Sequence, residues 1–112
     1  MDEATARERL LRRRGELAEE DQMSAAERAP VTLDQDSVGR LSRIDAMQVQ
    51  AMALAAERRR AGERMRIDAA LKRLGEGEFG YCLTCGEEIS PGRLEHDPSV
   101  SQCLACASGE NS

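Results

Sequence analysis

The chain has 112 residues, a net charge of −5 and only two aromatic residues. Such a chain forms one compact domain at most, or a small domain with an extension, and it lacks the bulky residues of a large core. No apolar stretch approaches 18 residues, so the sequence predicts no membrane-spanning helix. Because no apolar signal segment follows Met1, we expect a cytoplasmic protein with reduced cysteines.

The charge is unevenly distributed along the chain. Residues 38–75 carry nine basic and four acidic side chains, whereas residues 76–112 carry seven acidic side chains and one basic, Arg93. Nucleic-acid binding relies on many lysine or arginine contacts to phosphate. The C-terminal part is therefore a poor candidate for reading DNA.

The first predicted helix covers residues 2–28, which are rich in Ala, Glu, Arg and Leu and contain no proline. It has a narrow apolar stripe in two rows, which suits one side of a helical hairpin. The rows are Leu10, Leu17 and Ser24, and Leu11, Ala18 and Ala25. We expect the arginines at 12–14 to form a solvated face beside nearby glutamates.

Pro30 stops this helix, because proline cannot continue the helical hydrogen-bond ladder. The segment Thr32-Leu-Asp-Gln35 matches a capping box, so the sequence predicts a turn near residues 29–36. A second helix then starts at Asp34 or Asp36, where a carboxylate complements the helix dipole, and runs to Leu74.

The second helix is near forty residues long, about 60 Å at 1.5 Å per residue. Its predicted apolar face consists of Val38, Leu41, Ile44, Met47 or Gln48, Ala51, Ala55, Met65, Leu71 and Leu74. We expect the arginines at 58–60 to be solvated. The simplest architecture is an antiparallel two-helix coiled coil with the turn at its far tip.

The four cysteines of the chain form two Cys-x-x-Cys pairs separated by seventeen residues. They are Cys82, Cys85, Cys103 and Cys106. This spacing is typical of a tetrahedral zinc site, and Gly86 after the first pair allows the positive φ that such turns need. The alternatives are two disulfides or a dithiol redox centre. Disulfides would suit a secreted chain, and a redox centre would need a βαβ context, which the sequence does not resemble. A site closed by four thiolates holds one structural Zn²⁺ and no open catalytic position.

The predicted fold is mainly α, with a two-helix hairpin over residues 1–75, a zinc-finger module over 76–107 and a flexible polar tail over 108–112. We expect Phe79 and Tyr81 to pack the module against the base of the hairpin, with Leu71, Leu74, Ile89 and Leu94. Pro91-Gly92 and Asp97-Pro98 indicate turns. His96 is expected to be a solvated loop residue and not a metal ligand. We find no paired nucleophile and base, which argues against an enzyme.

The C-terminal part closely resembles the four-cysteine zinc finger of the DksA/TraR family of bacterial transcription regulators. The resemblance rests on Phe79-Gly-Tyr-Cys-x-x-Cys-Gly-x-Glu-Ile89, then Arg93-Leu-Glu95, Pro98 and the second cysteine pair. It covers about thirty residues, and the preceding charged helix agrees with the helical hairpin of the family.

The resemblance implies a hairpin that enters the secondary channel of RNA polymerase, where acidic tip residues alter initiation without sequence-specific DNA contact. The usual tip motif Asp-x-x-Asp-x-Ala is not found, and we expect this chain to lack the additional N-terminal segment that full-length members carry ahead of the hairpin. Asp34 and Asp36 are the first candidates for the tip, and Asp45 with Ala46 is the second, since a shorter first helix would move the turn.

Family members that bind the alarmone ppGpp at the finger junction use basic residues where this chain has Asp97 and Ala107. An acidic side chain repels phosphates, so we predict reduced or absent ppGpp binding. Two alternatives to a polymerase-binding regulator stay open: a zinc-stabilised nucleic-acid-binding protein that uses the arginines of the second helix, and a helical protein–protein adaptor.

Overall fold

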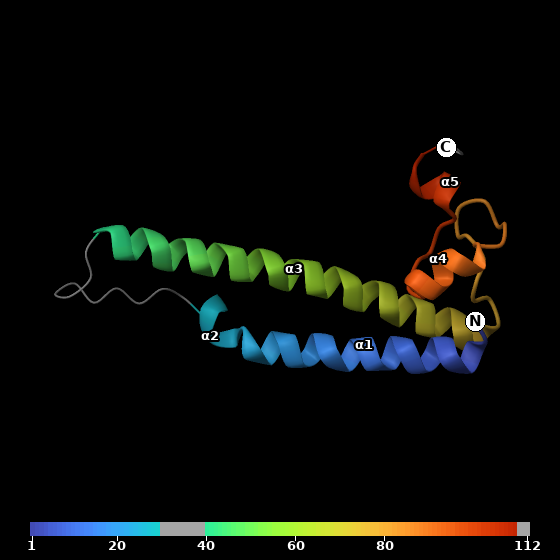
Figure 1. Ribbon diagram of the computed structural model, residues 1–112, viewed down its shortest axis with the longest axis horizontal. Coiled ribbons are helices and arrows are strands. Elements are labelled where there is room, and N and C mark those ends of the chain that lie inside the picture. The colour runs from blue at the N-terminus through green and yellow to red at the C-terminus, as the bar shows by residue number, and fades with distance from the viewer. Residues whose placement is uncertain (30–39, 110–112) are drawn as a thin grey trace.

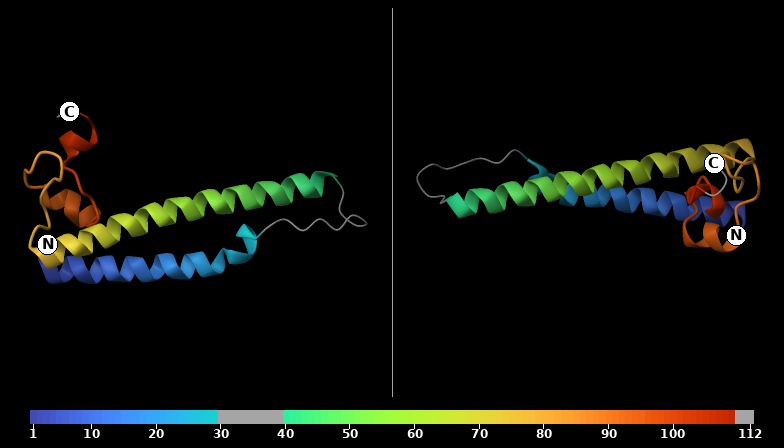
Figure 2. Two further views of the ribbon diagram at one scale, coloured as in Figure 1. Left: turned by 180° about the vertical axis from the view of Figure 1, so that it is seen from behind. Right: turned by 90° about the horizontal axis from the view of Figure 1, so that it is seen from above.

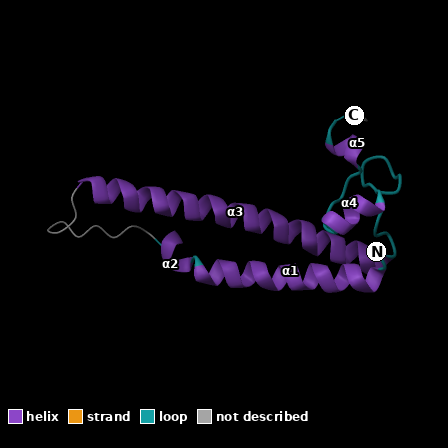
Figure 3. Cartoon of the chain, in the orientation of Figure 1, coloured by secondary structure: helices purple, strands orange, loops and turns teal. Residues whose placement is uncertain are grey.

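The computed structural model describes residues 1–29 and 40–109, which form an elongated, mainly helical molecule of 61 × 31 × 20 Å (Figure 1). The helices are α1 Glu3–Met23, α2 Ala25–Arg28, α3 Arg40–Glu76, α4 Pro91–His96 and α5 Leu104–Ala107. Within the described ranges there is no strand, only an isolated antiparallel bridge between Tyr81 and Glu88 (Figure 3). The predicted mainly α fold, a hairpin followed by a cysteine finger, is confirmed.

Helix α1 begins at a side-chain cap and ends earlier than predicted. The carboxylate of Asp2 accepts a hydrogen bond of 2.7 Å from the backbone N–H of Thr5. The helix stops at Met23, so a single helix over residues 2–28 is wrong. The hydroxyl of Ser24 lies within 3.1 Å of Arg28 Nε and 2.9 Å of Arg60 Nη2. A serine with such competing partners favours a helix end over a helix interior.

Helices α1 and α3 lie side by side and run antiparallel, as all three ribbon views show (Figures 1 and 2). Their contact is a small apolar core close to the finger end of the hairpin. Its buried members are Ala6, Leu10, Leu17, Ile67, Ala70 and Leu74, with Leu71 and Phe79 packed against them. This burial supplies the hydrophobic stabilisation that joins the two helices.

The predicted apolar face of α3 is correct only near its C-terminal end. Ile44, Met47 and Met65 are exposed, while Ala53 and Ile67 face inward. Val38 and the side chain of Leu41 lie outside the described residues. Helix α3 has 37 residues against 21 in α1, so much of its far half extends past α1 and its apolar side chains there stay in solvent.

Ion pairs between α1 and α3 fix the register of the hairpin. Arg13 Nε lies 2.8 Å from a Glu63 carboxylate oxygen, and Arg14 Nε lies 3.1 Å from Asp68. Farther out, Arg60 Nε donates to Asp21 across 2.6 Å. Three of the arginines predicted to be solvated are therefore bridges between helices. Among the described residues, no helix is both long and apolar enough to cross a membrane.

Candidate metal centre and hairpin tip

The first cysteine knuckle follows α3 through a glycine-rich turn. Gly77 and Gly80 have φ angles of 75° and 95°, which reverse the chain after the helix. The N–H of Cys82 then donates to the Glu87 carbonyl at 2.8 Å, and the N–H of Gly86 donates to the Cys82 carbonyl at 2.9 Å. Gly86 has a φ of 77°, as predicted, so the knuckle depends on a conformation that other residues rarely adopt.

The second knuckle is built at the start of α5. The backbone N–H of Cys106 points at the sulfur of Cys103 at 3.4 Å, in the same way that the N–H of Cys85 points at the sulfur of Cys82 at 3.5 Å. A backbone hydrogen bond of 2.8 Å from Leu83 to the carbonyl of Ser101 joins the two knuckles. These contacts bring cysteines from opposite ends of the finger together.

The four cysteine sulfurs form one compact cluster, with all Sγ atoms within 4.8 Å of one another. The sulfurs of Cys85 and Cys103 are 3.7 Å apart. A tetrahedral zinc ion with bonds of about 2.3 Å would separate its sulfur ligands by about 3.8 Å, so the cluster fits one zinc. All four cysteines are described, and none forms a disulfide.

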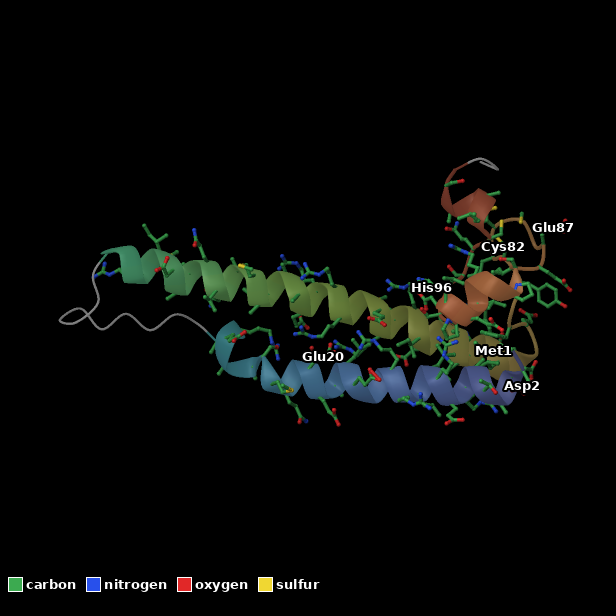
Figure 4. The ribbon with its side chains drawn as sticks, in the orientation of Figure 1. Met1, Asp2, Glu20, Cys82, Glu87 and His96 are labelled. Atoms are coloured by element: carbon green, nitrogen blue, oxygen red, sulfur yellow. The ribbon has the colours of Figure 1, made fainter. Side chains whose placement is uncertain are left out.

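His96 does not belong to this cluster. It is the last residue of α4 and lies on the hairpin side of the finger, apart from Cys82 (Figure 4). The expectation of a loop residue is corrected to a helix end, and its side chain is exposed as expected. The four-sulfur set is therefore complete without a nitrogen ligand, which is typical of a closed structural site.

The thiols differ in how readily they ionise. Burial opposes ionisation of Cys82, but N–H groups of Cys85, Cys103 and Thr84 outweigh it and lower its pKa to about 6. Burial and the neighbouring Cys103 raise the pKa of Cys106 to about 12. Four adjacent thiolates repel one another, so a divalent cation is what makes full deprotonation favourable.

The finger is fixed to the base of the hairpin by buried and polar contacts. Phe79 packs against the hairpin core, and Arg9 Nη1 donates to the Glu95 carbonyl at 2.6 Å. Arg73 is buried, which lowers its pKa, and its Nη2 lies 3.4 Å from the Val100 carbonyl.

Two expectations about the finger are wrong. Tyr81 is exposed because its neighbour Cys82 takes the inward position in an extended segment, so Phe79 alone among the two rings packs on the hairpin core. Pro91-Gly92 opens helix α4 instead of a free turn, since proline suits the first position of a helix.

The structure describes only some of the predicted tip residues. Asp34 and Asp36 lie outside the described residues. Asp45 and Ala46 are exposed on α3, about 8 Å along the axis from Arg40. They lie farther out than Gln50, whose Nε2 donates to the Ala29 carbonyl at 2.8 Å.

Comparison with known proteins connects this site with one family. Residues 77–111 match the prokaryotic DksA/TraR C4-type zinc finger. The solved structure of transcription factor DksA2 from Pseudomonas aeruginosa superposes with a TM-score of 0.74 over 97% of this chain and 82% of that one, at 25% identity. The finger is of the DksA/TraR type, and the chain as a whole is DksA-like in fold. The expected DksA-like character and the one structural zinc are thereby confirmed.

The curated DksA relatives match only in the finger region. The "RNA polymerase-binding transcription factor DksA" of Haemophilus influenzae is 49% identical over 41 residues, which are 37% of this chain and 28% of that protein. The protein of the same name from Escherichia coli K12 is 42% identical over 41 residues, 27% of its length. The matched segment thus spans little more than a quarter of these DksA proteins.

Sequence reasoning missed the polar cluster at the far end of α1. Asp21 accepts hydrogen bonds from Arg60 and Arg64, and Ser24 accepts one from Arg60. The arginine hydrogen bonds lower the pKa of the Asp21 carboxyl. The sequence does contain a signal for this cluster, which is an acid near the end of one helix and two arginines four residues apart on the other. To pair them, however, one must know the register between the two helices.

Proposed function

We propose that this protein is a DksA-like regulator that binds RNA polymerase through its secondary channel and modulates initiation without sequence-specific DNA contact. The observation that carries the proposal is the combination of a closed zinc finger with a long hairpin, in the arrangement of DksA2 over 97% of the chain. Relatives that share the finger are named RNA polymerase-binding transcription factors.

The shape of the hairpin suits insertion into a narrow channel. Helix α3 has 37 residues, a reach of about 55 Å, and the finger lies entirely at one end of it (Figure 1). The far half of α3 carries exposed side chains with little cover from α1. We propose that residues 1–75 act as the inserting rod and 76–107 as the module that stays outside.

The tip carboxylates are the proposed working groups. Asp34 and Asp36 are the first candidates, and Asp45 with Ala46 is the second. The solvent exposure of Asp45 and its position near the far end of α3 support the second pair. Carboxylates here would act by electrostatic contact near the catalytic magnesium region of the polymerase, so the protein itself performs no catalysis.

The nucleic-acid alternative is weakened by the ion pairs of the hairpin. Of the α3 arginines that this alternative would use, Arg60 and Arg64 both lie against the Asp21 carboxylate. Arginines already paired in this way offer less to phosphate, because a new contact must replace an existing one. The adaptor alternative predicts stable self-association or another helical partner, which sedimentation would reveal.

We propose that ppGpp binding at the finger junction is reduced or absent. The carboxylate of Asp97 accepts hydrogen bonds from the N–H and hydroxyl of Ser99 at 3.0 and 2.7 Å. These hydrogen bonds hold the carboxylate in place at the position where phosphates would have to approach.

The proposed function is tested by transcription with purified RNA polymerase, with and without the protein. Substituting both Asp34→Asn and Asp36→Asn, or Asp45→Asn alone, should reduce the effect on initiation while leaving folding and polymerase binding intact. Asp68→Asn, an exposed aspartate nearer the hairpin base, is the matched control and should behave like the parent chain. No effect of the parent protein on any promoter, together with no polymerase binding, would refute the proposal.

A further inference from the structure

The far half of α3 has an apolar groove that the hairpin core does not fill. It has a volume of about 430 Å³ and lies where α3 runs beside the short helix α2 (Figure 1). Its lining includes Val49, Met52, Ala53 and Ala56 of α3, with Glu27 of α2. Val49 is 49% exposed and Met52 72%, so large apolar side chains face solvent here.

Charged side chains lie at equal distances on either side of Met52. Asp45 is seven residues before it and Arg59 seven residues after it. Residues seven apart are nearly two full turns apart, so all three lie on one side of α3. Asp45 and Arg59 are exposed, and within residues 1–29 and 40–109 neither forms an ion pair. The groove therefore has an acid at one end and a base at the other.

This order of side chains is complementary to itself when it is reversed. If two copies of α3 cross antiparallel with Met52 on a two-fold axis, a residue before Met52 in one copy meets the residue equally far after it in the other. Asp45 then meets Arg59 of the second copy, twice over, and Val49 meets the small Ala55. A parallel arrangement would place each charge against itself, which is unfavourable.

We propose that this side of α3 binds the same side of a second copy of the chain, antiparallel and with Met52 against Met52. We call Asp45, Val49, Met52, Ala56 and Arg59 the Met52 face. The self-complementary charges select a second copy over an unrelated helix, while Val49 and Met52 supply apolar contact. A contact over residues 45–59 is about 21 Å long, which is short for a permanent interface, so the dimer forms reversibly.

The dimer and the polymerase-bound state exclude each other. The Met52 face lies on the part of the hairpin proposed to enter the channel, and a second hairpin bound there would make the rod too wide to insert. This consequence rests on the proposed function, whereas self-association of the free chain does not. It also differs from the adaptor alternative, in which the associated chain would be the working form.

Sedimentation equilibrium of the purified chain tests the Met52 face without polymerase. Met52→Glu places two carboxylates against each other at the two-fold axis and should weaken self-association about tenfold or more. Met65→Glu is the matched control, since Met65 is 74% exposed on the same helix and lies about 140° around it from Met52. It should associate like the parent. Helicity and zinc content check that both variants fold.

Charge reversal tests the antiparallel register. Asp45→Arg gives a chain with a positive charge at both ends of the face, and Arg59→Asp gives one with a negative charge at both ends. Each variant alone should associate more weakly than the parent, because like charges meet. An equimolar mixture should recover association, since both opposite-charge pairs form between the two variants. High salt should reduce this recovery.

The inference is overturned if the parent chain is monomeric, if Met52→Glu associates like the parent, or if the mixture associates no better than its components. Adding RNA polymerase to the associated parent should give one chain per polymerase, and two chains bound through one hairpin would contradict the exclusion. If the variants behave as predicted but the parent does not bind polymerase, the dimer is supported and the proposed function fails by itself.

Discussion

Arg60 donates from Nε to one carboxylate oxygen of Asp21 across 2.6 Å, while Arg64 donates to the other oxygen. The Arg60 side chain is only 13% exposed and that of Asp21 23%. This pair lies beyond the apolar core, where α1 is about to end. It therefore joins the two helices in the outer part of the hairpin, beyond the apolar core that joins them nearer the finger.

Replacing Asp21 should weaken the hairpin more than replacing an exposed acid. Asp21→Asn removes the charge partner of the partly buried Arg60 and one of the two carboxylates beside Arg64, so we expect the free energy of unfolding to fall by about 1.5–3 kcal/mol. Asp68→Asn breaks an ion pair whose side chains are both 53% exposed and should cost under about 1 kcal/mol. Denaturant unfolding followed by circular dichroism checks both, and equal costs would contradict the role assigned to Asp21.

The same carboxylate predicts how stability depends on pH. Hydrogen bonds from Arg60 lower the pKa of Asp21 in the folded chain below its ordinary value of 3.8. Its contribution is therefore complete above that value and is lost as pH falls through the lower, folded pKa. The stability difference between the parent and Asp21→Asn should shrink below about pH 4. Both chains release zinc in acid, so this effect cancels when their stabilities are subtracted. A stability difference that does not change on acidification would contradict the role assigned to Asp21.

Gly86 and Gly75 form a matched pair of glycines. Alanine at Gly86 meets no atom within 4 Å but must adopt a φ near 77°, so we expect Gly86→Ala to destabilise the finger by about 1–2 kcal/mol and to weaken zinc binding. Gly75 lies inside α3 with equally open space, and Gly75→Ala should stabilise the helix by up to about 1 kcal/mol. Competition with a zinc-binding dye measures the first effect and thermal unfolding the second. The same sign for both substitutions would refute this account.

Removing zinc should unfold the finger while leaving most of the helical signal. The finger helices α4 and α5 have six and four residues, against 21 in α1 and 37 in α3, and the hairpin core contains no cysteine. A chelator or Cys82→Ser should therefore reduce helicity only slightly, but should make the amides of residues 81–107 exchange rapidly with solvent. Hydrogen exchange detects this directly. Unchanged protection of the finger in a metal-free sample would show that zinc is not its structural support.

The sequence was most informative where chemistry restricts the choice of residue. Four cysteines in two pairs predicted a zinc cluster, and Gly86 predicted a positive φ, because few other residues serve in those places. The antiparallel hairpin followed from Pro30 and the long helix-favouring segments around it. These features depend on local chemistry, which a single sequence contains.

The face of α3 and the ends of the helices could not be predicted in the same way. Alanine and methionine recur on several faces of α3, so apolar spacing alone did not exclude exposed Met65 or select Ile67. The choice depends on Leu10 and Leu17 of α1 and on the Asp21–Arg60 pair, which are set by the register between helices. The break at Ser24 likewise depends on Arg60, a residue 36 positions away.

The central claim is that the far end of the hairpin enters RNA polymerase, and site-specific crosslinking tests it most directly. A photoreactive residue in place of Ala46 is compared with one in place of Ala69, which is also exposed on α3 but lies nearer the finger. We predict that position 46 crosslinks to the polymerase interior beside the catalytic centre, while position 69 reaches only the channel entrance or no polymerase at all. A bound protein whose position 46 crosslinks only to DNA, to a second copy or to the outer surface of the polymerase would contradict the claim.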